Sequence, residues 1–204
     1  MLRSVKGLKH PDRSCLGAKP KLVVFDLDAC LWTPEMFQLP SMPNVPIKGD
    51  LHGGQGVVGL KCGKRGPTVE LYEGALLALQ ELCTSQHWKE TKIAAASSSL
   101  EPSYSYACLQ SIEIFPGVNL SSVFSHLAIG REGELSPDKK THFTKIHKES
   151  GIHFKDMLFF DDCIWGDNVQ RVDDLFGVVG VRTPNGIQKH DWENGLKLYA
   201  ERWG

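Results

Sequence analysis

The chain of 204 residues lacks the features that would place it in several large classes of protein. No run approaches the roughly 18 apolar residues that a membrane-spanning helix needs, so we expect no membrane contact. No apolar secretory segment stands near its start, which favours an intracellular, cytoplasmic location. The sequence also shows no internal repeat and no long low-complexity stretch. What remains is a chain whose length suits one sizeable α/β domain.

The cysteines form neither a disulfide framework nor a zinc site. There are six, scattered at positions 15, 30, 62, 83, 108 and 163. No C-x-x-C pair and no Cys/His cluster at zinc-binding spacing occurs among them. We therefore expect reduced thiols, as in an intracellular protein.

The formal net charge of −1 conceals an asymmetric start. Residues 1–21 carry six Lys/Arg against Asp12 alone, which leaves the rest of the chain acidic. We expect residues 1–20 to form a disordered basic arm. A nucleic-acid contact is disfavoured, and an organelle-targeting helix is weakened by Pro11 and Pro20 but stays open.

Four continuous apolar runs indicate the strands of a buried parallel sheet, because they show no alternation with polar residues. They are KLVVF (21–25), KIAAA (92–96), MLFF (157–160) and GVVGV (177–181). Apolar residues at helical spacing follow in residues 72–83 and near the end of the chain. Strands alternating with helices predict an α/β fold with a doubly wound, mostly parallel sheet over residues 21–204.

Residues 33–71 interrupt this alternation because they are rich in Pro and Gly. The stretch GVVGLKCGKRGPTVELY (56–72) is typical of two short strands around the turn GKRG. We expect a small β-hairpin flap at this point, close to the mouth of any site at the end of the first strand. The segment is too short for a second domain.

Acidic and hydroxyl side chains follow the predicted strands at their carboxyl ends, where open α/β sheets bind ligands. They are Asp26 and Asp28, Ser97–Ser99, and Asp161 and Asp162. Asp26 and Asp28 share a face of an extended chain and can point at one spot. Because carboxylates that converge without a partner repel one another, a hard cation such as Mg²⁺ is the expected companion. An isolated D-x-D is ordinarily a turn or a helix cap, but this one follows a buried strand.

Four motifs in order resemble those of the haloacid dehalogenase (HAD) superfamily. They are FDLDACL (25–31), KIAAAS ending at Ser97, SPDKKTHF with Lys139 opening a helix, and MLFFDD (157–162). Lys140 competes with Lys139 for the third motif. The closest resemblance is to the small magnesium-dependent phosphatases, which implies an HAD-like Rossmannoid fold with no large cap domain.

The resemblance implies catalytic roles for the first two aspartates. Asp26 would be the nucleophile, forming an aspartyl phosphate, and also a metal ligand. Asp28 would protonate the leaving oxygen, activate water and bind the metal through its backbone carbonyl.

The resemblance also implies a substrate-binding and metal-binding set. Ser97, Ser98 and Lys139 would hold the phosphoryl group. Asp162 would complete the Mg²⁺ ligands, with Asp161 or Asp167 behind it.

The chain is thus expected to be a Mg²⁺-dependent phosphomonoester hydrolase. Its substrate would be a phosphoprotein, phosphotyrosine included, or a small metabolite such as a sugar phosphate. Dehalogenation is disfavoured because the second carboxylate serves phosphate leaving groups. Cys30, Ser98 and the stretch CIWGDN after Asp162 depart from the family pattern, so a catalytically silent phosphate- or partner-binding relative is the alternative.

The sequence allows two interpretations for each of two pairs of side chains near the motifs. Trp32 and Trp165 either stack on the substrate or pack in the core. Cys30 and Cys163 are either inert, buried thiols or groups whose oxidation blocks the site.

Overall fold

The computed structural model describes residues 8–204, and residues 1–7 of the expected arm lie outside the described residues. Its central element is a five-stranded sheet in the order β11-β10-β1-β6-β9, in which every neighbouring pair is parallel. The strands are β1 (Leu22–Phe25), β6 (Lys92–Ser97), β9 (His126–Ile129), β10 (Met157–Asp161) and β11 (Val179–Arg182). Four of these are the predicted apolar runs, and β9 was not predicted.

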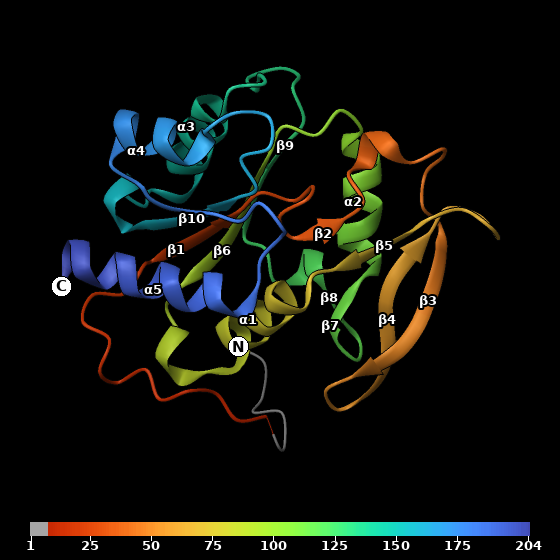
Figure 1. The fold of residues 1–204 in the computed structure, drawn as a ribbon, viewed down its shortest axis with the longest axis horizontal. Coiled ribbons are helices and arrows are strands. Elements are labelled where there is room, and N and C mark those ends of the chain that lie inside the picture. Colours follow the sequence, from red (N-terminus) through yellow and green to blue (C-terminus); the bar gives the residue numbers. More distant parts are fainter. Residues whose placement is uncertain (1–7) are drawn as a thin grey trace.

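Within residues 8–204, α-helices cover both faces of this sheet. They are α1 (Glu73–Thr84), α2 (Pro102–Ser111), α3 (Lys139–Ser150), α4 (Asn168–Phe176) and α5 (Lys189–Trp203). Helices α1 and α5 lie on one side, and α3 and α4 lie on the other (Figure 1). Short 3₁₀ turns are η1 (Met36–Gln38), η2 (Gln86–Trp88), η3 (Leu120–Ser122) and η4 (Phe154–Asp156). No helix in the described part of the chain has the length and hydrophobicity needed to cross a bilayer.

The two faces of β1 supply two separate cores. Val23 and Phe25 belong to the cluster that includes helices α1 and α5. Leu22 and Val24 point the other way and pack in a cluster with Phe143 of α3. Because both faces are buried, every position of the strand is apolar. The carboxyl ends of the strands are therefore where polar side chains gather.

The predicted hairpin is part of a larger antiparallel sheet with the order β2-β5-β4-β3. Its strands are β2 (Trp32–Thr33), β3 (Val45–Leu51), β4 (Gly54–Lys61) and β5 (Thr68–Leu71). Strands β4 and β5 form the hairpin around GKRG. The sequence did not predict β3, because Pro46 and Gly49 interrupt the alternation of its apolar residues Val45, Ile47 and Leu51. A further short pair is β7 (Glu113–Phe115) and β8 (Val118–Asn119).

The expectation of a disordered arm is wrong for residues 8–20, which pack against the helices. Arg13 is only 8% exposed, and its Nε and Nη2 donate to the two carboxylate oxygens of Glu81 at 2.8 and 2.9 Å. Its Nη2 also donates to Glu193 on α5 at 2.9 Å. Trp88 and Trp192 donate to the same Glu81 carboxylate. A charge that looked solvated in the sequence is thus one half of a buried ion pair.

Candidate active site

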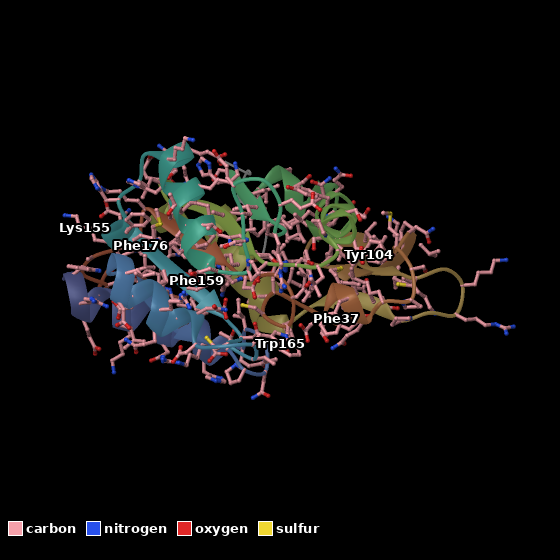
Figure 2. All side chains as sticks on the ribbon, turned by 90° about the horizontal axis from the view of Figure 1, so that it is seen from above. Phe37, Tyr104, Lys155, Phe159, Trp165 and Phe176 are labelled. Atoms are coloured by element: carbon pink, nitrogen blue, oxygen red, sulfur yellow. The ribbon has the colours of Figure 1, made fainter. Side chains whose placement is uncertain are left out.

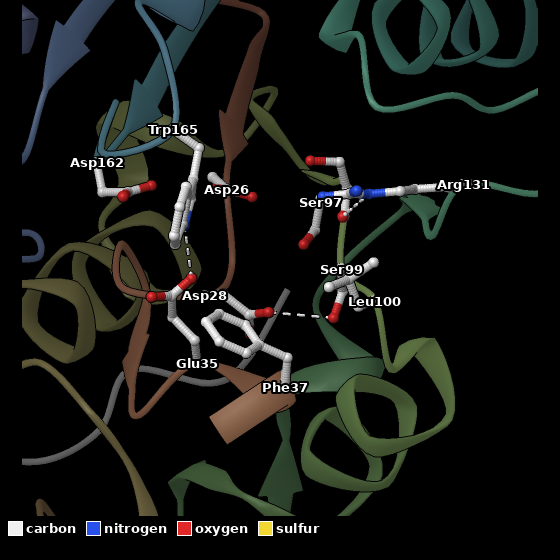
Figure 3. A pocket seen from close by; sticks show the side chains of 11 residues that line it. Asp26, Asp28, Glu35, Phe37, Ser97, Ser99, Leu100, Arg131, Asp162 and Trp165 are labelled. Carbon is white, nitrogen blue, oxygen red and sulfur yellow. Dashed lines mark hydrogen bonds between the residues drawn. The ribbon is translucent and has the colours of Figure 1, made fainter. Parts of the chain in front are cut away.

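The carboxyl ends of four parallel strands surround one cavity of about 230 Å³. Asp26 directly follows β1, and Ser97 is the last residue of β6. Arg131 is the second residue after β9, and Asp162 directly follows β10. All four side chains line the cavity, as Figure 3 shows. The site was predicted at this edge of the sheet. The four side chains meet there because the strands that precede them are parallel and end at the same edge.

Asp26, Asp161 and Asp162 form one acidic cluster. Each offers a carboxylate oxygen, and these oxygens all lie within 4.8 Å of one another. Burial raises the pKa of Asp162 to about 6, and the neighbouring Asp161 charge adds to the effect. Burial also raises the pKa of Asp26 well above its ordinary value, against the lowering effect of Lys139. A positive charge bound among these three carboxylates would offset their mutual repulsion.

Lys139 is the cation built into this cluster. It is 1% exposed, and its Nζ donates to Asp26 Oδ1 at 2.7 Å and to the Ala96 carbonyl at 2.6 Å. Its Nζ also lies 3.4 Å from Asp161 Oδ2. Burial alone lowers the pKa of Lys139, but the charges of Asp26 and Asp161 outweigh it and raise that pKa. Lys140 is exposed, so Lys139 is the lysine that reaches the site.

Helix α3 is fixed so that Lys139 enters the cluster from its first turn. The Asp138 side chain caps the helix by accepting from the Lys140 backbone N–H at 2.9 Å. His142, one turn along, is fully buried, with Nε2 3.1 Å from the carbonyls of both Ser97 and Gly130. Burial lowers the pKa of His142 to about 4, so its neutral ring ties α3 to the ends of β6 and β9.

The donor set of the cluster suits a hard divalent cation. All three groups are carboxylates, and oxygen donors are what Mg²⁺ takes in proteins, at about 2.1 Å. A single Lys139 ammonium leaves the three carboxylates short of positive charge. Of the two acids considered as the partner of Asp162, Asp161 lies in the cluster. Asp167 instead caps α4 and pairs with Arg182.

The Asp28 carboxylate lies outside the cluster and has its own hydrogen-bond partners. Trp32 Nε1 donates to its Oδ1 at 2.8 Å, and Ser99 Oγ donates to its Oδ2 at 3.1 Å. Burial raises the pKa of Asp28, while these two donors lower it. A carboxyl with a raised pKa is suited to donate a proton near neutral pH. Ser99 thus orients Asp28, a role that the sequence did not assign.

Trp32 is a core residue and offers no stacking surface, because it is fully buried. Of the serines predicted to bind substrate, both Ser97 and Ser98 line the cavity. The backbone carbonyl of Ser98 accepts a hydrogen bond from Arg131 Nε at 2.7 Å.

Backbone strain is concentrated beside the acidic residues. Ala29 and Cys163 are the non-glycine residues with positive φ in the described chain, both at 56°. One directly follows Asp28 and the other directly follows Asp162. Left-handed backbone at a residue with a Cβ costs free energy and often marks a functional turn.

The two motif cysteines are protonated thiols. Cys30 is fully buried, and burial raises its pKa well above the ordinary value, with the Asp26 charge adding to it. Burial, followed by the Asp161 charge, raises the pKa of Cys163 to about 12. Because thiolates are the reactive form, neither environment activates its sulfur.

Trp165 is the one residue at the mouth of the cavity that the sequence had singled out. The other mouth residues are Glu35 and Phe37 from the segment after β2, Leu100 after β6 and Arg131 after β9. The hairpin of β4 and β5 contributes no lining residue to this cavity. The expectation that the hairpin lies at the mouth is therefore wrong. Only the start of the 33–71 segment reaches the site, because the hairpin packs against β2 and β3 instead.

The parallel sheet, the small antiparallel sheet and the clustered motifs are those of a HAD-like hydrolase. The chain belongs to the Acid Phosphatase family, whose model matches residues 18–202. The predicted α/β fold and phosphatase class are thereby confirmed.

Relatives and solved structures agree with this assignment. A HAD-like hydrolase superfamily protein of Schizosaccharomyces pombe is 29% identical over 153 residues, covering 75% of this chain and 81% of its own. Magnesium-dependent phosphatase 1 of Homo sapiens is 29% identical over 183 residues, covering 89% and 88%. The phosphatase-containing N-terminal part of Bacteroides fragilis BF1531, solved with Mg, superposes with a TM-score of 0.57 at 15% identity. That match covers 92% of this chain and 42% of the bacterial one, and it shows the fold.

Proposed function

We propose that this phosphatase hydrolyses phosphomonoesters with Mg²⁺ through an aspartyl-phosphate intermediate. The observation that carries the proposal is the position of Asp26. Its carboxylate lines the cavity, accepts a hydrogen bond from Lys139 at 2.7 Å and shares the acidic cluster with Asp161 and Asp162. A nucleophile needs this combination of access to substrate and compensated charge. The name of the human relative, Magnesium-dependent phosphatase 1, supports the choice of metal.

In the first step a carboxylate oxygen of Asp26 attacks phosphorus and the bond from phosphorus to the leaving oxygen breaks. Asp28, whose pKa burial raises, gives its proton to that oxygen. In the second step a water attacks phosphorus, Asp28 takes the proton from the water, and the bond between Asp26 and phosphorus breaks. Inorganic phosphate leaves, and both carboxyl groups return to their starting states.

The remaining residues position the phosphoryl group. Ser97 and Ser98 line the cavity beside Asp26 and donate to phosphoryl oxygens. Lys139 aims the Asp26 carboxylate and lowers its pKa against the effect of burial. The Mg²⁺ would be held by Asp26 and Asp162 together with the backbone carbonyl of Asp28. Asp161 would lie behind these ligands. When bound, this ion neutralises the charge of the phosphoryl oxygens.

The substrate is a phosphoprotein, phosphotyrosine included, or a small metabolite such as a sugar phosphate. An intracellular location fits the six cysteines, all of which are free thiols. The alternative, a catalytically silent phosphate-binding relative, shares the cavity but would not turn over substrate.

The test is turnover of p-nitrophenyl phosphate with Mg²⁺, with EDTA and in two variants. Wild-type protein should be active with Mg²⁺ and inactive with EDTA. Asp26→Asn should be inactive while it still unfolds cooperatively, because Lys139 keeps its pairing with Asp161. Asp50→Asn, on the exposed strand β3, is the matched control and should keep full activity. Acid quench with ³²P-labelled substrate should trap label on Asp26. Activity in Asp26→Asn would refute the nucleophile, and a wild type that binds phosphate without turnover would favour the silent relative.

A further inference from the structure

An exposed aromatic pair forms one wall of the mouth of the cavity. Trp165 is 74% exposed and Phe37 is 45% exposed, and both line the cavity. Their rings meet edge to face, with centroids 6.2 Å apart and planes at 70°. Trp165 Nε1 also donates to Glu35 Oε2 at 3.0 Å. Figure 2 shows the two aromatic residues next to each other on one side of the molecule.

These contacts fix the wall before any ligand arrives. Trp165 belongs to the loop after β10, whereas Glu35 and Phe37 belong to the segment after β2. The two loops therefore hold each other along one side of the mouth. Leu100, 57% exposed, lies on the other side of the cavity, as Figure 3 shows. Large apolar surfaces left open on both sides of a catalytic cavity indicate that an apolar group occupies the space between them.

The cavity is small. Its volume of about 230 Å³ lies below the roughly 300–1,000 Å³ of pockets that enclose drug-sized ligands. A phosphoryl group beside Asp26 and one ring-sized group beyond it fill such a space. The apolar walls offer few partners to the several hydroxyl groups of a sugar, and they favour a flat, apolar ring.

The charges at the mouth are divided between its two sides. Arg131 is the one basic side chain among the described residues that line the cavity, where Asp26, Asp28, Glu35 and Asp162 supply the acids. Its Nε donates to the Ser98 carbonyl, which fixes the guanidinium beside the phosphoryl position. Figure 3 shows Arg131 on the side away from Glu35 and Trp165. An anionic substituent on the ring is repelled on the Glu35 side and attracted on the Arg131 side.

We infer that the outer half of the cavity is a leaving-group subsite for an aromatic ring that carries an anionic substituent. The ring packs against Trp165 and Phe37, and the anion pairs with Arg131. The inference rests on the proposed hydrolase activity and names the class of substrate for it.

The ring is tested with benzyl phosphate and cyclohexylmethyl phosphate, which match in size and in the basicity of the leaving alcohol. Wild-type kcat/KM should favour the benzyl ester by about 3- to 10-fold, the size expected of aromatic packing. Trp165→Leu should bring the ratio close to one. Ile164→Ala is the matched control, because Ile164 is the 52% exposed neighbour that does not line the cavity, and it should keep the wild-type ratio.

The anion is tested with 4-carboxybenzyl phosphate and its neutral amide analogue, 4-carbamoylbenzyl phosphate. At low ionic strength the carboxylate should raise kcat/KM by about 3- to 10-fold, as a charge-assisted pair with a guanidinium does. Arg131→Gln should abolish the difference. Arg65→Gln, in the exposed turn between β4 and β5, should preserve it. An acidic peptide carrying an aryl phosphate, compared with 4-carboxybenzyl phosphate, tells whether the ring belongs to a protein or to a small molecule.

A binding measurement shows whether a negative result refutes the proposed subsite or the proposed hydrolase activity. The corresponding phosphonates, which cannot be hydrolysed, are titrated against wild-type protein with Mg²⁺, with tryptophan fluorescence as the readout. A preference for the aromatic and for the anionic phosphonate in binding would support the subsite. If the matching phosphate esters were then not hydrolysed, that outcome would refute the hydrolase activity but not the subsite. Equal turnover and equal binding of the benzyl and cyclohexylmethyl compounds would overturn the subsite and leave the hydrolase standing.

Discussion

The indole nitrogen of Trp32 donates a hydrogen bond to Oδ1 of Asp28 at 2.8 Å. The tryptophan is fully buried, so the proposed acid is held by a donor that cannot turn away to solvent. Ser99 holds the second oxygen of the same carboxylate. These contacts fix the proposed proton donor at the side of the cavity and partly oppose the effect of burial on its pKa.

Trp32→Phe should shift the alkaline limb of the pH profile of kcat upward. The Trp32 hydrogen bond lowers the pKa of Asp28, so its loss raises that pKa and keeps the acid form to higher pH. We expect a shift of up to about one pH unit, since a hydrogen bond to a charged group is worth ~1.5 kcal/mol or more. Trp88→Phe is the control, because Trp88 is also buried but donates to Glu81. A downward shift, or the same shift in both variants, would contradict this role.

Asp28→Asn should slow the first step most for poor leaving groups. General acid catalysis contributes typically ~10²- to 10⁴-fold, and basic alkoxides need the proton more than nitrophenolate does. Burst kinetics with benzyl phosphate and p-nitrophenyl phosphate measure the difference. Equal losses for both esters would remove Asp28 from this role.

Lys139→Met should destabilise the metal-free protein because it leaves the carboxylates of Asp26 and Asp161 without their buried cation. The cost should approach ~3–5 kcal/mol at pH 8, as for a broken buried ion pair, and should fall towards lower pH as Asp26, whose pKa burial raises, gains a proton. Saturating Mg²⁺ should recover part of it. Lys140→Met, at the exposed neighbour, should change urea-unfolding stability by less than ~0.5 kcal/mol. Equal effects of the two variants would mean that the buried pair adds no stability.

Without Mg²⁺ the protein should lose stability as the pH rises from about 4 to 7. Burial raises the pKa of Asp162 from 3.8 to about 6. The folded state therefore binds this proton more tightly than the unfolded state, and the stabilisation that it gives is lost as the pH rises through about 6. The loss amounts to up to ~3 kcal/mol for this group alone. Tm measured against pH in EDTA and in Mg²⁺ tests this: the metal should remove the decline, and a flat profile in EDTA would contradict it.

Arg13→Gln should lower the free energy of unfolding by ~3–5 kcal/mol, because it leaves the Glu81 carboxylate buried without a cation. Lys21→Gln breaks a pair whose lysine is 67% exposed and should cost ~1 kcal/mol or less. Urea unfolding of both variants measures the two effects. Both should keep kcat, since neither residue lines the cavity. A loss below ~1 kcal/mol in Arg13→Gln would show that residues 8–20 add little to stability.

The strands that were predicted correctly share one property. β1 and β10 are buried throughout, and β6 and β11 are buried at most of their apolar positions, so each appears in the sequence as a continuous apolar run. β9 was missed because its first residues, His126 and Leu127, are only partly buried and the run is just four residues long. β3 was missed because it is a largely exposed strand in which Pro46 and Gly49 interrupt the few apolar residues.

The residues of the site likewise fall into those that the local sequence marks and those that it does not. The sequence by itself determined that Asp26, Asp28, Ser97, Lys139 and Asp162 would stand at the ends of strands or at the start of a helix, since these motifs are local. It left open which of Lys139 and Lys140, and which of Asp161 and Asp167, faces the centre. The tertiary structure decided both, because burial against Asp26 selects one lysine and the acidic cluster selects one aspartate.

Only the tertiary structure decided what surrounds the leaving group. Glu35, Phe37, Leu100 and Arg131 come from separate loops, and nothing in their local sequence marks them. Trp165 was ambiguous in the sequence, since an isolated tryptophan packs in a core as readily as it lines a mouth. Local motifs follow from chain spacing and from the periodicity of strand and helix, whereas the mouth of a cavity depends on which distant loops the packed sheet brings side by side.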